Sequence, residues 1–176
     1  DADYARKGNL IKWNPAVKTA ADRDALRAGL LDGAVDVVAT DHAPHTLEEK
    51  ERPYASAPSG GPLVQHSLPM MLELSAQGVL PVETVVEKMC HAPARLFGVR
   101  DRGFLRTGHF ADIVLVRPAD PWTVSKENIL YKCGWSPLEG TAFSHRIVRT
   151  LVNGRTVYAD GRVDTTHRGA ELEFDR

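Results

Sequence analysis

The sequence has little of what several classes of protein require. Its 176 residues include only two cysteines, Cys90 and Cys133, too few for a disulfide scaffold and without the C-x-x-C spacing of a structural zinc site. No apolar run approaches the ~20 residues that a membrane-spanning helix needs. Basic and acidic residues nearly cancel, 22 against 23, so we expect neither a nucleic acid nor a membrane as a partner. These absences predict a globular, cytoplasmic protein.

The apolar share of 43% is enough to fill a core, and its pattern predicts a strand, a helix and a second strand at the start of the chain. The first strand is expected over residues 9–13. A capping signature at Thr19 and Asp22 predicts a helix that ends at Gly33. The apolar run over residues 35–40 predicts the second strand, buried and parallel to the first.

The middle of the chain is first polar and then helical. Residues 41–61 are rich in proline and glycine, and a connection of this length inside a compact domain is typical of a functional loop. Two helices are predicted after it, over residues 63–77 and 82–90, because apolar side chains recur there at helical spacing.

The last part of the sequence predicts β structure. A buried strand is expected over residues 111–116, and Asn153-Gly154 between two apolar runs predicts a type I′ hairpin turn. Because helices give way to strands, we divide the chain into two domains, residues 1–102 and residues 103–176.

The candidate site lies where the second predicted strand ends. The sequence DHAPH, residues 41–45, follows that strand directly, and the carboxyl edge of parallel strands is where ligand sites form in α/β folds. Asp41 offers a carboxylate ligand for a metal, and His42 and His45 offer imidazoles. The residues alone leave two interpretations open: a metal site, or an aspartate that caps the loop beside two solvent-facing histidines.

The same segment, with EEK following it, resembles the signature of dihydroorotases, cyclic amidohydrolases of the amidohydrolase superfamily. The similarity extends over nearly the whole chain. The other matching segments are KWNP at 12–15, APSG at 57–60 and, shared with many amidohydrolases, HAPARLFG at 91–98 and GHFADIVLV at 108–116.

The fold that this resemblance implies is α/β. Residues 1–102 would form the last strands and helices of a (β/α)8 barrel of the amidohydrolase type. Residues 103–176 would form the C-terminal strands of a small β-sandwich domain and the tail.

The activity that the resemblance implies is the reversible hydrolysis of the ring amide of dihydroorotate to N-carbamoyl-aspartate in pyrimidine biosynthesis. Asp41 would be the catalytic residue, a metal ligand that also passes a proton to the departing ring nitrogen. Asn14 and His45 would bind the substrate carboxylate. Ser59 and Gly60 would hold ring atoms through their main-chain groups.

The resemblance also implies cofactors and partners. Such a site holds two Zn2+ ions, bridged by a carboxylated lysine and bound by an H-x-H pair and two further histidines. This sequence has seven histidines and none in an H-x-H pattern, so we expect it to be the C-terminal part of a longer enzyme and inactive alone. The expected partners are the small-molecule substrate and either a second copy of the protein or aspartate transcarbamoylase.

Two alternatives to dihydroorotase stay open. One is a related cyclic amidohydrolase of the hydantoinase, dihydropyrimidinase or allantoinase type, although those enzymes usually lack a histidine at the place of His45. The other is a catalytically silent dihydroorotase-like subunit that supports a partner. Ser59 stands where the family usually has an aromatic residue, and residues 14–18 read NPAVK in place of the common NPPLR.

Overall fold

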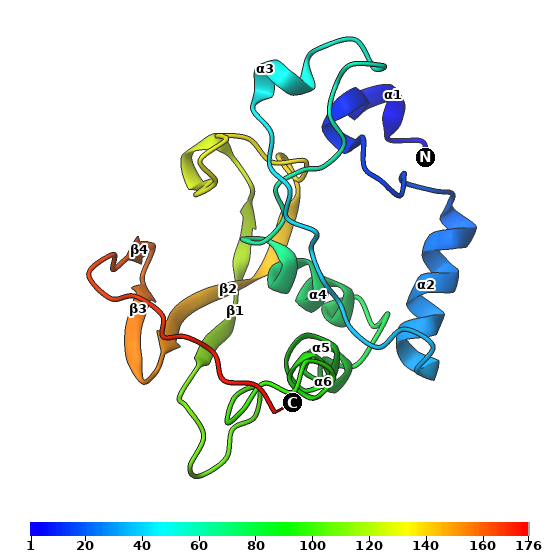
Figure 1. Ribbon diagram of the computed structural model, residues 1–176. Coiled ribbons are helices and arrows are strands. Elements are labelled where there is room, and N and C mark those ends of the chain that lie inside the picture. Colours follow the sequence, from blue (N-terminus) through cyan, green and yellow to red (C-terminus); the bar gives the residue numbers. More distant parts are fainter. Residues whose placement is uncertain (176) are drawn as a thin grey trace.

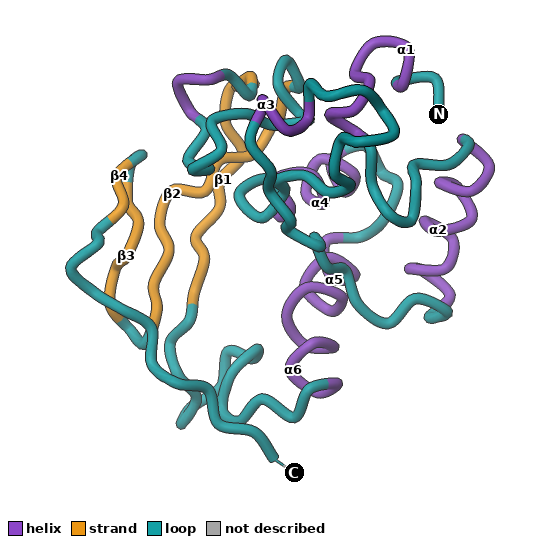
Figure 2. The backbone as a smooth tube through the Cα atoms, turned by 45° about the horizontal axis from the view of Figure 1, so that its top comes forward, coloured by secondary structure: helices purple, strands orange, loops and turns teal. Residues whose placement is uncertain are grey.

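The computed structural model describes residues 1–175. Its helices are α1 Tyr4–Lys7, α2 Ala20–Asp32, α3 Leu47–Lys50, α4 Ser67–Ala76, α5 Val82–Val86 and α6 Ala92–Leu96, with 3-10 turns η1 Gly8–Ile11 and η3 Lys126–Asn128 and a π-helical turn η2 Glu87–His91. Its strands are β1 Ile113–Thr123, β2 Ala142–Val152, β3 Arg155–Ala159 and β4 Arg162–Val163. The helix α4 packs against β2, α5 and α6 lie on the same side of the sheet across a hollow from β1, and α2 stands farther away (Figures 1 and 2).

The four strands form one antiparallel sheet in the order β1-β2-β3-β4. The predicted hairpin is confirmed. Asn153 and Gly154 connect β2 to β3 with φ angles of 52° and 77°, the two positive values that a type I′ turn requires. All strands in the described part of the chain follow residue 103. The division into two domains at this point stays a prediction.

The helix α2 follows its sequence signals closely. The Thr19 hydroxyl accepts a hydrogen bond from the Asp22 N–H, and the Asp22 carboxylate accepts one from the Thr19 N–H, which completes a capping box. Gly33 ends the helix with a φ of 89°. The predicted start and end of this helix are therefore confirmed.

The two later helices differ from their predicted extents. The helix α4 begins at Ser67, four residues after the predicted start, and the N–H groups of residues 63–65 donate to side chains from elsewhere in the chain. The segment from Val82 to Leu96 continues past the predicted end but widens into the π-helical turn η2. Pro93 lies shortly after that turn, lacks an N–H and crowds the preceding carbonyls, which accounts for the wider register.

The strands predicted over residues 9–13 and 35–40 are wrong for this structure. Residues Gly8–Ile11 form the 3-10 turn η1, and residues 35–40 are extended without a paired strand among the described residues. Val38 N–H donates to the Lys88 carbonyl at 3.0 Å, and one isolated parallel bridge joins His42 to Gly61. The strand β1 does form, but Val114 is 44% exposed, so the predicted burial is wrong there.

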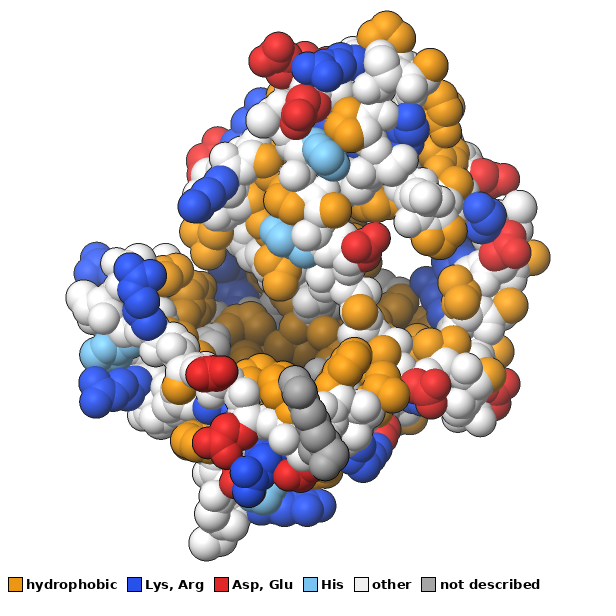
Figure 3. Space-filling view, in the orientation of Figure 1, with side chains coloured by type: hydrophobic (Ala, Val, Ile, Leu, Met, Phe, Trp, Pro, Cys, Tyr) orange, Lys and Arg blue, Asp and Glu red, His pale blue; other side chains and the backbone are white. Residues whose placement is uncertain are grey.

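The hydrophobic core lies between the helices and the sheet. Met71 and Leu72 from α4 pack with Leu80 and with Val85 from α5. An apolar cavity of about 960 Å³ continues from this core between the helical region and β1. Figure 3 shows the hydrophobic side chains gathered in this hollow. No helix in residues 1–175 is long and apolar enough to span a membrane.

Candidate active site

The segment DHAPH, residues 41–45, forms neither helix nor strand, and an isolated bridge at His42 joins it to the loop that contains Gly61. Asp41 is exposed and has a φ of 43°, in the left-handed region that aspartate adopts more readily than most residues. After it, Ala43 N–H donates to the Gly61 carbonyl at 3.3 Å. The main chain is therefore anchored just after Asp41, and the Asp41 carboxylate remains open to solvent.

His42 stabilises the loop through its ring. Its Nδ1 accepts hydrogen bonds from Leu63 N–H at 3.1 Å and Val64 N–H at 3.4 Å, so the neutral ring carries its proton on Nε2. The ring also lies 5.4 Å from the ring of Tyr131. Because the Nδ1 lone pair is in use, His42 holds the start of the next segment and offers no free ligand atom at Nδ1.

His45 joins two segments that the sequence analysis assigned to one site. Its Nε2–H donates to the Ser59 carbonyl at 3.1 Å, and its Nδ1 lies 3.7 Å from the Glu49 carboxylate. The carbonyl of His45 itself accepts a hydrogen bond from the indole N–H of Trp135 at 2.8 Å. The ring of His45 is therefore held by residues nearby in the sequence, and its main chain is held by a residue 90 positions away.

A short helix begins one residue later and is capped by its own side chains. The Thr46 N–H donates to the Glu49 carboxylate at 2.9 Å, and the Glu49 N–H donates back to the Thr46 hydroxyl at 3.2 Å. The Thr46 N–H and hydroxyl both donate to the Glu49 carboxylate, and these two hydrogen bonds lower the pKa of that carboxyl from its ordinary value. The capped turn α3 ends at Lys50 and directs that side chain into the protein.

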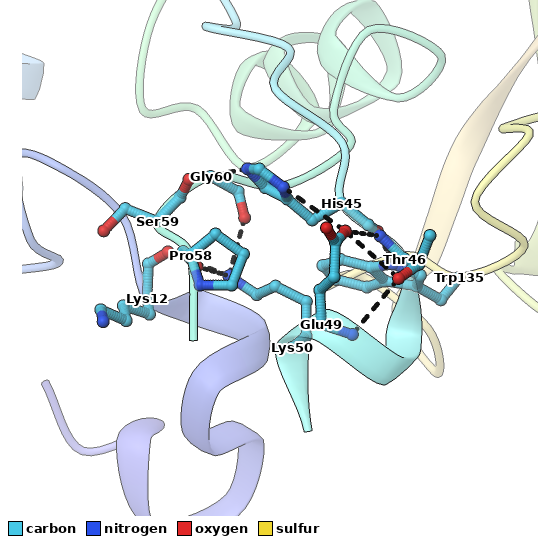
Figure 4. A network of polar contacts seen from close by, with 9 residues as sticks. All are labelled: Lys12, His45, Thr46, Glu49, Lys50, Pro58, Ser59, Gly60 and Trp135. Carbon is cyan, nitrogen blue, oxygen red and sulfur yellow. Dashed lines mark hydrogen bonds and ion pairs between the residues drawn. The ribbon is translucent and has the colours of Figure 1, made fainter. Parts of the chain in front are cut away.

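Lys50 is the centre of the polar network in Figure 4. Its side chain is 1% exposed, and its Nζ donates to the carbonyls of Gly60 at 2.8 Å, Pro58 at 2.9 Å and Lys12 at 3.2 Å. Burial lowers the pKa of the Lys50 ammonium, since the charged form loses its hydration. Three separate parts of the chain meet at this one charged group.

Gly60 has a conformation and surroundings that exclude a side chain. Its φ is 121°, and a Cβ at this position would lie 2.7 Å from the Ala43 carbonyl oxygen. Its N–H donates to the Lys12 carbonyl at 2.9 Å. The Gly60 N–H is therefore already bound to an acceptor, whereas the described residues provide no acceptor for the Ser59 N–H. Within residues 1–175, only the Ser59 N–H of these two groups is free for the predicted contact with substrate.

The structure thus brings together some of the predicted site residues. His45, Ser59 and Gly60 belong to one hydrogen-bonded network, which Lys12 connects to the segment that contains Asn14. The side chains of Asn14 and Asp41 form no hydrogen bond with residues 1–175, and both positions are exposed. Their roles stay predictions.

Sequence reasoning missed two residues of this network, Lys50 and Trp135. Lysine is among the residue types least often buried, so nothing local in the sequence indicates an inward ammonium. Trp135 is 3% exposed and contacts His45 from 90 positions away in the chain. The only available signal for Lys50 was its place in the EEK segment that follows DHAPH.

A second polar cluster links this site to the sheet. His66 is fully buried, and its Nδ1 lies 2.9 Å from the Tyr131 hydroxyl, which also accepts a hydrogen bond from Gln65 N–H at 3.1 Å. The His66 ring packs near Trp122 of β1 and Phe143 of β2. Burial lowers the pKa of His66 to about 4 and raises the pKa of Tyr131 to about 12.

The predicted zinc site is not complete in this chain. Catalytic zinc takes about three protein ligands, and within residues 1–175 no group of three His, Cys, Asp or Glu side chains could hold a metal ion. Asp41 offers one carboxylate, and the His42 Nδ1 is already an acceptor. The described residues therefore do not fit a zinc centre by themselves.

Comparison with known families and structures agrees with this geometry. The sequence profile of the amidohydrolase family matches residues 7–157. The chain belongs to the amidohydrolase family. Within it, proteins named dihydroorotase from Pelobacter propionicus and Clostridioides difficile are 42% and 36% identical to this chain over 147 and 159 residues. The dihydroorotase of Halobacterium salinarum is 39% identical over 151 residues.

These three matches cover 84%, 90% and 86% of this chain but 34%, 37% and 36% of the relatives. The chain thus spans about a third of the length of the curated relatives it matches, and the resemblance to dihydroorotases is confirmed over that part.

Solved structures of cyclic amidohydrolases share the fold. The L-hydantoinase (dihydropyrimidinase) of Arthrobacter aurescens is 32% identical, with a TM-score of 0.86, over 93% of this chain and 38% of that one. A D-hydantoinase structure has a TM-score of 0.85 at 23% identity, over 92% of this chain and 37% of that one, and shows the fold alone.

Proposed function

We propose that the natural protein carrying this sequence is a dihydroorotase, and that this chain supplies the last part of its barrel and the strands of its small β-sandwich domain. The observation that carries the proposal is the hydrogen bond from His45 Nε2–H to the Ser59 carbonyl at 3.1 Å. It joins two segments to which the dihydroorotase resemblance independently assigns substrate binding. The identities of 36–42% to proteins of that name support the same activity.

In the proposed reaction, the oxygen of a water molecule attacks the ring amide carbonyl, and the ring C–N bond breaks. The Asp41 carboxylate, which is exposed in this structure, accepts a proton from that water and gives it to the departing ring nitrogen. His45 and Asn14 bind the substrate carboxylate, and Ser59 contacts the ring. A carboxylate that takes the His45 Nε2–H would release the Ser59 carbonyl.

The proposal includes zinc and a cytoplasmic location, together with a homodimer or a complex with aspartate transcarbamoylase. The dihydroorotase resemblance supports all of these. Zinc, when bound, would activate water as a Lewis acid. Asp41 would supply one ligand, and the other ligands would come from outside these residues. We therefore expect the 176-residue chain alone to show no ring opening with added Zn2+.

The decisive experiment compares substrates and one substitution in the complete natural protein. We expect a higher kcat/KM for dihydroorotate than for hydantoin, dihydrouracil or allantoin. Asp41→Asn should lower kcat by about a thousandfold, because an amide does not carry the proton. Asp36→Asn, an exposed aspartate of the preceding extended segment, is the matched control and should retain wild-type turnover.

A second candidate is hydantoinase activity, which the 32% identity to the L-hydantoinase of Arthrobacter aurescens favours. A higher kcat/KM on hydantoin would establish it and reject dihydroorotase. Absence of turnover on every ring, with the protein folded and loaded with metal, would instead indicate the silent subunit.

A further inference from the structure

Lys50 is a buried cation without a carboxylate partner. Its side chain is 1% exposed, and within residues 1–175 no acidic group forms an ion pair with it. An ammonium group has three N–H bonds, and here three main-chain carbonyls accept from Nζ at 2.8–3.2 Å. Burying a charge in this way is costly unless every donor is satisfied, so the site must be held in one geometry.

The Lys50 ammonium orients the main chain on both sides of Ser59. The carbonyls of Pro58 and Gly60, on either side of Ser59, both bind Nζ, whereas the Ser59 carbonyl binds the His45 ring. Figure 4 shows the His45 ring and the Lys50 ammonium on either side of this short loop. Without the ammonium, the two carbonyls would lose the partner that orients them, and the acceptor for His45 Nε2–H would move with them.

We propose that Lys50 is a positioning residue whose ammonium fixes the main chain of residues 58–60. Through the Ser59 carbonyl it holds the ring of His45, before substrate binds, in the orientation from which the Nε2–H passes to the substrate carboxylate. This inference rests on the proposed function for the identity of the substrate. It does not rest on it for the loop geometry, which can be measured without turnover.

The chain contains a matched control for this role. Lys12 Nζ donates to the carbonyls of Tyr54 and Ala57, both at 2.6 Å, on the earlier half of the same loop. It therefore also ties an ammonium to two main-chain carbonyls, but it reaches neither Ser59 nor His45. Removing the Lys12 ammonium therefore measures how much KM and stability change when this loop loses a lysine bound to two carbonyls away from Ser59.

The experiment compares Lys50→Met and Lys12→Met with wild type in the complete natural protein. Methionine keeps a similar length and removes the charge. At a temperature where circular dichroism shows each variant folded, we expect Lys50→Met to raise the KM for dihydroorotate at least tenfold, with a smaller fall in kcat. We expect Lys12→Met to change KM less than threefold.

A chemical rescue separates positioning from general stability. In Lys50→Ala, propylammonium replaces the missing atoms, and n-propanol has a similar size without the charge. We expect propylammonium to lower KM toward the wild-type value and n-propanol to have no such effect. This variant also serves if Lys50→Met does not fold.

Hydrogen exchange gives a readout without activity. We expect the Gly60 amide, which donates to the Lys12 carbonyl, to exchange at least tenfold faster in Lys50→Met than in wild type, and at the wild-type rate in Lys12→Met. A wild type that turns over hydantoin and not dihydroorotate rejects the proposed function, and the same variants are then measured on hydantoin. Unchanged exchange of the Gly60 amide, or a lower Tm with KM within threefold of wild type, overturns the role of Lys50.

Discussion

The β2–β3 hairpin and the loop of residues 41–62 are held together in different ways. The hairpin is closed by main-chain pairs between residues close in sequence, from Val152 with Arg155 outward to Arg149 with Ala159. The loop has no repeated main-chain ladder. Its conformation depends on a few side chains, chiefly Lys50 and Trp135, that bind carbonyls far along the chain.

This difference predicts where single substitutions act. In a ladder, many equivalent main-chain hydrogen bonds contribute to stability. A substitution of one side chain leaves these hydrogen bonds in place, so its effect on the free energy of unfolding is small. In the loop, several carbonyls depend on one buried donor, and an unsatisfied buried group costs about 1–3 kcal/mol. We therefore expect substitutions in the loop to cost more stability than comparable ones in the hairpin, and to change activity as well.

The largest expected effect is that of Gly60→Ala. The added Cβ would lie 2.7 Å from the Ala43 carbonyl oxygen, and a φ of 121° is unfavourable for any other residue. We expect the free energy of unfolding in urea to fall by at least about 3 kcal/mol. Gly169→Ala is the control, because a Cβ there meets no atom within 4 Å. A loss below about 1 kcal/mol for Gly60→Ala would break the comparison.

The second expected effect concerns the buried cluster around His66, whose ring packs near Trp122 of β1 and Phe143 of β2, and it depends on pH. Burial lowers the pKa of His66 from 6.5 to about 4. Below pH 6.5 the unfolded chain binds a proton that the folded chain does not bind, so stability falls as pH decreases from 6.5 to 4. The expected loss is up to about 3 kcal/mol.

Urea unfolding of wild type and His66→Gln between pH 7 and pH 4.5 measures this loss. The difference between the two proteins removes the contribution of other titrating groups. The control is His167→Gln, because His167 lies outside the buried cluster. In this variant the free energy of unfolding should change with pH as steeply as in wild type. An equal slope in wild type and His66→Gln would show that His66 does not cause the pH dependence.

The third prediction compares two tryptophans that make the same kind of bond. Trp135 Nε1–H donates to the His45 carbonyl, and Trp122 Nε1–H donates to the His145 carbonyl, both at 2.8 Å. Phenylalanine at either position removes the donor, and we expect a loss of about 2 kcal/mol in each case. Only Trp135→Phe should also raise KM, because only His45 belongs to the site. Equal KM values in the two variants would count against that distinction.

The smallest expected effect is in the hairpin turn. Gly154 has a φ of 77°, which alanine adopts with some strain, but an added Cβ would make only an ordinary contact with Ala111 at 3.9 Å. We expect Gly154→Ala to lower the free energy of unfolding by about 1 kcal/mol and to leave turnover unchanged. Thermal unfolding and a turnover assay check both statements, and a loss as large as that of Gly60→Ala would contradict the contrast between ladder and loop.

The sequence predicts structure well where the causes are local. Thr19 and Asp22 form the expected capping box, and Asn153-Gly154 forms the expected turn, because each signal acts within a few residues. The run over residues 35–40 has the composition of a strand, but a strand also needs a partner to pair with. Within the described residues the N–H of Val38 finds only the Lys88 carbonyl.

The same contrast between local signals and distant partners applies to the candidate site. The resemblance carried by DHAPH and APSG predicts roles for His45 and Ser59, and the structure joins these two residues by a hydrogen bond. Apart from the place of Lys50 in the EEK segment, it did not indicate that Lys50 and Trp135 support these residues, because the partners of the two side chains lie up to 38 and 90 positions away. Contacts at such separation follow from the packed fold and leave no periodic trace in the sequence.

The bond between Trp135 and His45 also determines when this loop can be completed during synthesis. The two residues are 90 positions apart. A ribosome adds about 5–20 residues per second, so roughly 5 to 18 seconds separate the synthesis of His45 from that of Trp135. Throughout that interval the His45 carbonyl lacks its indole donor, and the loop acquires this last partner only when the later segment has left the ribosome.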